Sequence, residues 1–394
     1  MRASSLIEKN GDTGVISSDL WRWSATTIAD AVRRGSLSVE EVVHSVLVRI
    51  AEVNPKINAF ALLDADGALA QARLRDNARA GGQPAGLLEG VPIHVKDLIP
   101  TAGMETAYGS FVMDGNVPAS DVCYYASWAP YPLDRELDLI ARVAQSSRVR
   151  VVPVARTVMG ADVDLLTIGE AGPGKRTCWI IARQHPSESM SGYFLEGMLP
   201  RLVDEHDPVA RQLLDRAVIH VVPNMNPDGT RLGHTRGNGA GANLNREWAD
   251  PSPDRSPEVF AVRARMEVTG VDFFMDCHGD EELRCVFLGG PLEIPSRNPR
   301  SASLFGQFER AWMAVSPEYE LGHGYPGGPP ETADLRMAWN WVAERFGCLG
   351  VLLEQPFKDT SWATDPVRGW SPQRATLLGH SFPAALNQVV AHLR

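Results

Sequence analysis

Three runs of almost uninterrupted apolar residues most constrain the fold of this chain. They cover residues 218–222, 271–275 and 349–353. Such runs are typical of strands that are covered on both faces. Segments with apolar residues at helical spacing alternate with them, so we predict a mixed, mostly parallel α/β sheet with helices on both faces. The other predicted strands are 149–154, 164–168 and 177–182, and the predicted helices are 134–144, 189–203, 303–315, 333–346 and 374–392.

Polar and reactive residues follow several of these runs. His185 and Glu188 come after the strand predicted at 177–182, His278 follows the second long run after Asp276 and Cys277, and Glu354 directly follows the third. A fourth cluster, N-M-N-P-D-G, follows the first run. In open α/β sheets, sites form at the carboxyl ends of strands. One H-x-x-E arises often by chance, but four clusters at strand ends do not, so we predict a shared site at one edge of the sheet.

Two imidazoles and one carboxylate, from His185, His278 and Glu188, form a ligand set that suits zinc. Three protein ligands leave a fourth position for water, as in catalytic rather than closed structural sites. The carboxylate of Glu354 would be costly to bury without a partner, which favours a role as the proton acceptor for that water. The sequence therefore predicts a hydrolase that uses one zinc ion.

The constellation as a whole resembles the zinc metallocarboxypeptidase family over residues 123–394. The likeness is greatest to the cytosolic-carboxypeptidase branch, through the N-P-D-G turn at 226–229, the N-L-N-R-x-W motif at 243–248 and the pair Pro130-Tyr131. The resemblance implies a zinc carboxypeptidase fold. It also implies an enzyme that removes C-terminal residues from peptides or protein tails.

Carried over residue by residue, the resemblance gives each matching side chain a role. The zinc ligands of the family match His185, Glu188 and His278, and its catalytic glutamate matches Glu354. The pair that grips the substrate carboxylate matches Asn245 and Arg246. The arginine that polarises the scissile carbonyl matches Arg236. A guanidinium binds a carboxylate in a two-pronged geometry, so Arg246 would demand a free C-terminus. Arg236 would stabilise the developing oxyanion.

Three further residues each allow two interpretations. The family's loop tyrosine matches Tyr325, which lies in a flexible Gly- and Pro-rich segment but further from Glu354 than the family spacing. Asp276 would orient the imidazole of a zinc ligand or would only cap a strand end. Arg336 would favour acidic C-terminal residues in the side-chain pocket, or would lie on a helix surface.

Two other functions remain compatible with these residues. An aspartoacylase-like hydrolase of small N-acyl amino acids shares the zinc site and the Asn-Arg clamp, and activity on peptides longer than a dipeptide would separate it. A catalytically silent module would keep zinc and clamp but only bind protein C-termini. The intact Glu354 argues against the silent module, whereas the displaced Tyr325 argues for it.

The beginning of the chain has a different character. Residues 86–97, which include a predicted short strand from 90 onward, resemble the start of the amidase-signature family, and the likeness covers about 25–118. In that family the lysine that matches Lys96 is the base for a Ser–Ser pair further along the chain, and that part is absent here. We therefore predict a mainly helical, non-catalytic segment at 1–120 ahead of a catalytic domain at 121–394.

Charge and composition narrow the partners. The net charge of −10 argues against nucleic acid or an anionic membrane as the main partner. No run reaches membrane-spanning length, and residues 1–14 lack the apolar core of a signal peptide. The five cysteines are scattered without a C-x-x-C pair, and Cys178, Cys277 and Cys348 lie in apolar strand-like runs, which indicates buried free thiols. A cytoplasmic protein is the expectation.

Overall fold

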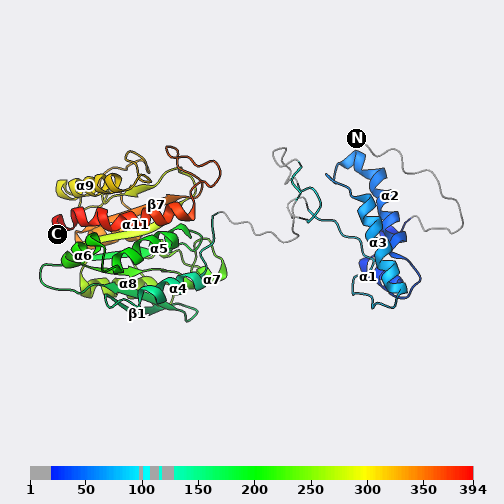
Figure 1. Cartoon of the computed structure of the whole chain (residues 1–394), viewed down its shortest axis with the longest axis horizontal. Coiled ribbons are helices and arrows are strands. Elements are labelled where there is room, and N and C mark those ends of the chain that lie inside the picture. Colours follow the sequence, from blue (N-terminus) through cyan, green and yellow to red (C-terminus); the bar gives the residue numbers. More distant parts are fainter. Residues whose placement is uncertain (1–18, 97–100, 107–114, 118–127, 394) are drawn as a thin grey trace. The chain divides into compact units, whose positions relative to one another are not determined.

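The chain forms two compact units, Met1–Tyr125 and Ala126–Arg394, and each is described by itself. Figure 1 labels their helices and strands. The predicted boundary between residues 120 and 121 lies outside the described residues. The computed structural model describes residues 19–96, 101–106, 115–117 and 128–393.

The described part of the first unit is helical. Ser38 begins α2 with a capping box: its side chain accepts the backbone N–H of Glu41, whose carboxylate accepts that of Ser38. Ile28, Val32 and Val42 form part of a small apolar core between the helices. The elements of this unit are η1 (Leu20–Arg22), α1 (Ala25–Arg33), α2 (Val39–Ile57) and α3 (Ala65–Ala80).

The short strand predicted from residue 90 onward is absent from the described residues 90–96, so this prediction is wrong. Ile93 is 82% exposed and Lys96 is also exposed. A strand needs a neighbour for its backbone N–H and C=O groups, and the described part of the first unit contains no other strand. Local composition indicated a strand, but a strand also needs a neighbouring strand, and local composition cannot show whether one is present.

The second unit contains a seven-stranded sheet in the order β1-β2-β4-β3-β5-β7-β6. The four central strands β4, β3, β5 and β7 run parallel, whereas β1–β2, β2–β4 and β6–β7 pair antiparallel. This arrangement confirms the predicted mixed, mostly parallel sheet. The strands are β1 (Val149–Arg156), β2 (Asp162–Ile168), β3 (Arg176–Ala182), β4 (Ala217–Val222), β5 (Phe273–Asp280), β6 (Phe287–Gly289) and β7 (Leu349–Pro356).

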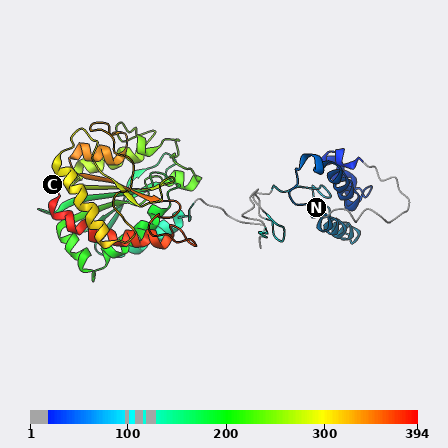
Figure 2. The same ribbon diagram turned by 90° about the horizontal axis from the view of Figure 1, so that it is seen from above.

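Helices cover both faces of this sheet, as Figure 2 shows. On one face α5 (Met190–Val203), α9 (Pro299–Val315) and α11 (Pro372–Val389) enclose the larger apolar core. On the other face α8 (Pro257–Thr269) and α10 (Ala338–Phe346) enclose the second core. No helix among the described residues has the length and apolar character needed to cross a membrane. The remaining elements are α4 (Leu133–Val143), α6 (Pro208–Arg216), α7 (Pro227–Leu232), η3 (Leu244–Arg246) and η4 (Val390–His392).

Two helices begin at other residues than predicted, one because of a contact distant in sequence and one because of local capping. The helix predicted at 333–346 begins only at Ala338, whose N–H donates to the side chain of Asn245 at 2.9 Å. The helix predicted at 303–315 begins earlier because Asn298 and Ser301 form a capping box. The first difference matters for the site, since it fastens the start of α10 to the N-L-N-R motif.

The sheet brings the predicted strand ends together. β5 pairs with both β3 and β7, so the three carboxyl ends meet at one edge. His278 in β5 lies directly opposite Glu354 in β7. His185 follows the last residue of β3, Ala182, by a short turn. The topology therefore gathers residues that lie far apart in the sequence.

Candidate active site

Three buried side chains bring their ligand atoms together where β3 and β5 end. His185, Glu188 and His278 are 3%, 4% and 1% exposed, and their donor atoms all lie within 4.8 Å of one another. One carboxylate oxygen of Glu188 lies 2.6 Å from Nδ1 of His185, and the other lies 2.6 Å from Nδ1 of His278. Two nitrogens and a carboxylate that converge in this way fit a zinc ion.

Each imidazole is held through its other nitrogen. Nε2 of His185 lies 3.0 Å from Oδ1 of Asn243, and Nε2 of His278 lies 2.9 Å from Oδ2 of Asp276. An amide oxygen and a carboxylate accept hydrogen bonds, so with a metal bound Nε2 would carry the hydrogen in both rings. Nδ1 is then the nitrogen that each ring offers to a metal. Asp276 therefore contacts the imidazole of His278, the position that its interpretation as an orienting residue requires.

The charges in this cluster support one another. Burial raises the pKa of Glu188, but the facing imidazoles of His278 and His185 lower it more, so the carboxyl has a pKa below its usual value. Burial lowers the pKa of His278, but Asp276 and Glu188 raise it well above its usual value. The buried carboxylates therefore stabilise positive charge between the two imidazoles, and this would favour the binding of a metal cation there.

Glu354 lies beside the cluster with a free oxygen. It is 7% exposed, and its Oε2 has no hydrogen-bond partner among the described residues. Burial raises the pKa of Glu354 well above its usual value, and Glu188 and Asp280 add to this effect although His278 opposes it. A carboxyl group with a raised pKa next to a cation site suits a residue that accepts and returns a proton.

Arg236, Asn245 and Arg246 all come from the segment behind α7. Nη1 of Arg236 lies 3.2 Å from Nδ1 of His185, and Nδ2 of Asn245 lies 3.3 Å from Nε2 of His278. Arg246 donates to the carbonyl oxygen of Asn245 at 2.7 Å and stays partly exposed. The structure therefore brings Arg236 and Asn245 to the metal-ligand cluster, and Arg246 lies next to Asn245 with Asp334 as its other partner.

Tyr325 also reaches the site, although it lies 29 residues before Glu354. Its hydroxyl group donates to Oδ2 of Asp280 at 2.5 Å and lies 3.5 Å from Oε1 of Glu354. The ring packs edge to face on Phe287 with centroids 4.8 Å apart. Burial raises the pKa of Tyr325, and Glu354 and Asp280 add to this effect, so the hydroxyl group keeps its proton.

Arg336 is engaged by a neighbouring carboxylate. Its guanidinium binds Asp334 through two hydrogen bonds of 2.9 Å each, and its side chain is 64% exposed. The same carboxylate lies 3.9 Å from Nε of Arg246. Asp334 thus links the proposed specificity residue to the proposed carboxylate clamp.

Two residues of the site were not predicted from the sequence. Asn243 opens the N-L-N-R motif, and its contact with His185 depends on a loop that no local pattern determines. Asp280 had a usable signal, because Asp276, His278 and Asp280 alternate along β5 and share one face. The spacing of two residues would have placed Asp280 beside the metal ligands.

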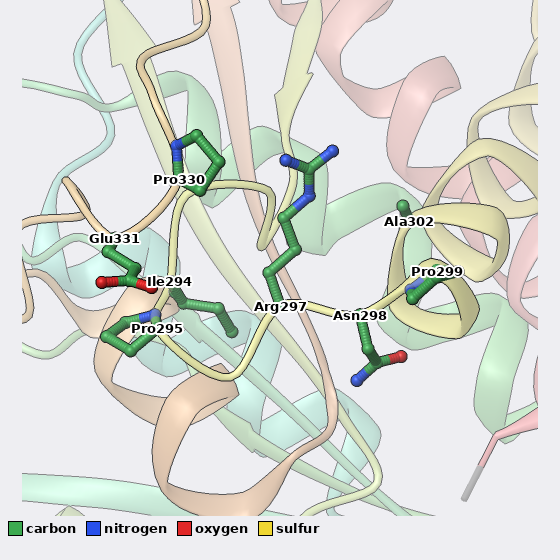
Figure 3. A pocket seen from close by; sticks show the side chains of 8 residues that line it. All are labelled: Ile294, Pro295, Arg297, Asn298, Pro299, Ala302, Pro330 and Glu331. Carbon is green, nitrogen blue, oxygen red and sulfur yellow. The ribbon is translucent and has the colours of Figure 1, made fainter.

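The pocket in Figure 3 is separate from this cluster. It is formed by the segment before α9, by the first turn of α9 and by Pro330 and Glu331. None of the predicted site residues lines it. The site is therefore located by its converging side chains and not by this pocket.

Comparisons with known proteins agree with this geometry. Residues 137–302 match the model of the zinc carboxypeptidase family. A metallo-carboxypeptidase from Burkholderia cenocepacia is 42% identical, with a TM-score of 0.67, over 70% of this chain and 74% of that one. A metallo-carboxypeptidase from Pseudomonas aeruginosa is 39% identical, with a TM-score of 0.66, over 68% of this chain and 71% of that one.

Other relatives cover smaller parts. Cytosolic carboxypeptidase 6 from Mus musculus is 32% identical over 39% of this chain and 30% of its own length. Residues 41–124 match the amidase family model. One subunit of the glutamyl-tRNA(Gln) amidotransferase from Acidothermus cellulolyticus is 43% identical over 26% of this chain but only 21% of its own length. The amidase likeness is thus confined to a fragment.

The metallo-carboxypeptidase likeness spans more than two thirds of the solved relatives, and the family model matches the residues that hold the buried metal-ligand cluster. The chain therefore belongs to the zinc carboxypeptidase family.

Proposed function

We propose that the second unit removes C-terminal residues from peptides or protein tails with one zinc ion held by His185, Glu188 and His278. The observation that carries this proposal is the convergence of three buried ligand atoms beside the unpartnered carboxylate oxygen of Glu354. When bound, zinc polarises the scissile carbonyl group and lowers the pKa of a water molecule. The rest of the chemistry belongs to the chain's own side chains.

Glu354 would take a proton from the attacking water and return it to the leaving amine. Arg246 and Asn245 would hold the terminal carboxylate of the substrate, and Arg236 would stabilise the developing oxyanion. Tyr325 would donate a hydrogen bond to the bound peptide from its loop. The relative from Pseudomonas aeruginosa was solved with (2-guanidinoethylmercapto)succinic acid, whose carboxyl groups are consistent with such a clamp.

Mass spectrometry of a peptide mixture with varied C-terminal residues tests this function. With zinc-loaded protein we expect the stepwise loss of single C-terminal residues, and a chelator should stop it. Restored trimming after zinc is added back is the control for irreversible damage. Intact peptides longer than a dipeptide, together with cleavage of N-acyl amino acids, would instead favour the aspartoacylase-like activity.

We further propose a preference for C-terminal glutamate or aspartate, with Arg336 as the group that binds the acidic side chain. Replacing Arg336 by alanine should lower the ratio of kcat/KM for a C-terminal glutamate over a C-terminal glutamine by about tenfold, the worth of one charge-assisted hydrogen bond. Arg345→Ala is the matched control, because Arg345 binds Glu267 on the surface through a similar two-pronged pair. An unchanged ratio in the Arg336 variant would exclude this role.

We propose that catalysis needs only residues 121–394, because Lys96 lacks the serine pair of an amidase. A chain of 121–394 should match the kcat/KM and thermal midpoint of the whole chain to within about twofold and a few degrees, since both large apolar cores of the second unit consist of its own residues. A large loss of either quantity would assign a supporting role to the first unit.

The names of the cytosolic relatives support a cytoplasmic location, and the net charge supports a peptide partner over nucleic acid or membrane.

A further inference from the structure

A chain of buried hydrogen bonds leads from the N-L-N-R-x-W motif to a metal ligand. Trp248, Gln184 and Asp276 are each fully buried. Nε1 of Trp248 donates to Oε1 of Gln184 at 2.8 Å, and Nε2 of Gln184 donates to Oδ2 of Asp276 at 2.7 Å. Nε2 of His278 lies 2.9 Å from the same Oδ2. These four side chains come from three separate segments of the second unit.

In this series of hydrogen bonds, the direction of each bond is fixed by the bond before it. An indole nitrogen can only donate, so it selects the amide oxygen of Gln184 and turns the amide nitrogen toward Asp276. A flipped amide would bring two donors, from Trp248 and Gln184, face to face. The amide group of Gln184 then holds Oδ2 of Asp276, the oxygen that accepts the hydrogen of Nε2 in His278. This leaves Nδ1 of His278 for the metal.

Asp276 depends on Gln184 for its orientation. Its Oδ1 is buried and has no hydrogen-bond partner among the described residues, so both contacts of the carboxylate pass through Oδ2. Rotation of a carboxylate about its last bond is otherwise only weakly restricted. Without Gln184, the bond to His278 alone would orient this carboxylate, and the imidazole would lose its fixed reference.

We propose that Gln184 and Trp248 are positioning residues that hold His278, through Asp276, in the orientation required of a zinc ligand. This proposal rests on the proposed zinc-dependent function. It gives a reason for two residues that otherwise have no task, the glutamine beside His185 and the tryptophan that closes the N-L-N-R-x-W motif. It also connects the segment that would clamp the substrate with the metal ligand on β5.

The first test measures the zinc dissociation constant of the full chain by competition with a chromophoric chelator. Gln184→Met keeps an unbranched side chain of similar length but removes both amide contacts. We expect zinc to bind 10- to 100-fold more weakly, the usual effect of losing a partner behind a metal ligand, and the visible spectrum of the cobalt-substituted protein to change. A dissociation constant within about twofold of the parent, in a folded variant, would overturn the proposal.

A matched pair of tryptophan variants keeps the test decisive if Gln184→Met fails to fold. Trp248→Phe and Trp312→Phe each remove one buried indole N–H, and that of Trp312 in α9 donates to Ser381 in α11 at 2.8 Å. Both should lose similar stability, but only Trp248→Phe should weaken zinc binding and alter the cobalt spectrum. Equal zinc binding by the two variants would overturn the role of Trp248. A parent protein that binds no zinc would instead overturn the proposed function, and this inference with it.

Discussion

Replacing Glu354 by glutamine should lower kcat for peptide cleavage by about 10²- to 10⁴-fold, the usual contribution of a general base. The amide keeps the shape of the side chain but cannot accept the proton of the attacking water. Because the metal ligands are unchanged, the variant should keep the zinc content of the parent. Steady-state kinetics on one synthetic peptide, with metal analysis of the same sample, measures both quantities.

The same substitution should not destabilise the fold. Burial raises the pKa of Glu354, so near neutral pH the folded state holds this carboxyl group less favourably in its charged form than the unfolded chain does. Removing that charge takes away an unfavourable contribution, and the urea midpoint of the metal-free protein should stay level or rise. Glu309→Gln is the control, because burial also raises the pKa of Glu309, which lies on α9 with Tyr319 as its partner. Glu309→Gln should keep full activity. If Glu354→Gln kept full activity as well, Glu354 would have no part in catalysis.

The main features of this site could be predicted because the fold class places strand ends together. His278 and Glu354 each follow a run whose apolar pattern indicated a covered strand, and the two strands are neighbours in the sheet. His185 and Glu188 lie directly behind a third such strand. The chemistry of two imidazoles and two carboxylates at one edge then followed from residue type alone.

The remaining features depend on loops and distant contacts that carry no local signal. The spacing of Tyr325 argued for a displaced or missing residue, yet its loop brings the hydroxyl group within 3.5 Å of Glu354. Asn243 reaches His185 only because the loop behind α7 folds back, with Gly237 paired to Asn243. The start of α10 was misplaced because Asn245, 93 residues before Ala338, receives its first free N–H. Each of these contacts is set by tertiary structure and not by propensity.

Replacing Gly379 by alanine should destabilise the second unit by roughly 3 kcal/mol or more, at the upper end for overpacked cores. A β-carbon at this position of α11 would overlap the backbone carbonyl group of Phe194 in α5. Gly197 in α5 faces the carbonyl oxygen of Thr376 in the same way, so the two helices touch backbone to backbone. Backbone atoms cannot rotate aside as a side chain can, and the helices would have to separate.

Gly306→Ala separates this packing effect from the helix propensity of alanine. Gly306 also lies inside a helix, α9, but a β-carbon there would meet only the end of the flexible Arg310 side chain. Alanine favours a helix by up to about 1 kcal/mol over glycine, so this control should be slightly more stable than the parent. Urea unfolding of the parent and both variants measures the difference. Because α5 begins two residues after Glu188, separation of the two helices in Gly379→Ala should also weaken zinc binding. A Gly379→Ala variant as stable and as zinc-loaded as the parent would show that α5 and α11 can accommodate the extra methyl group.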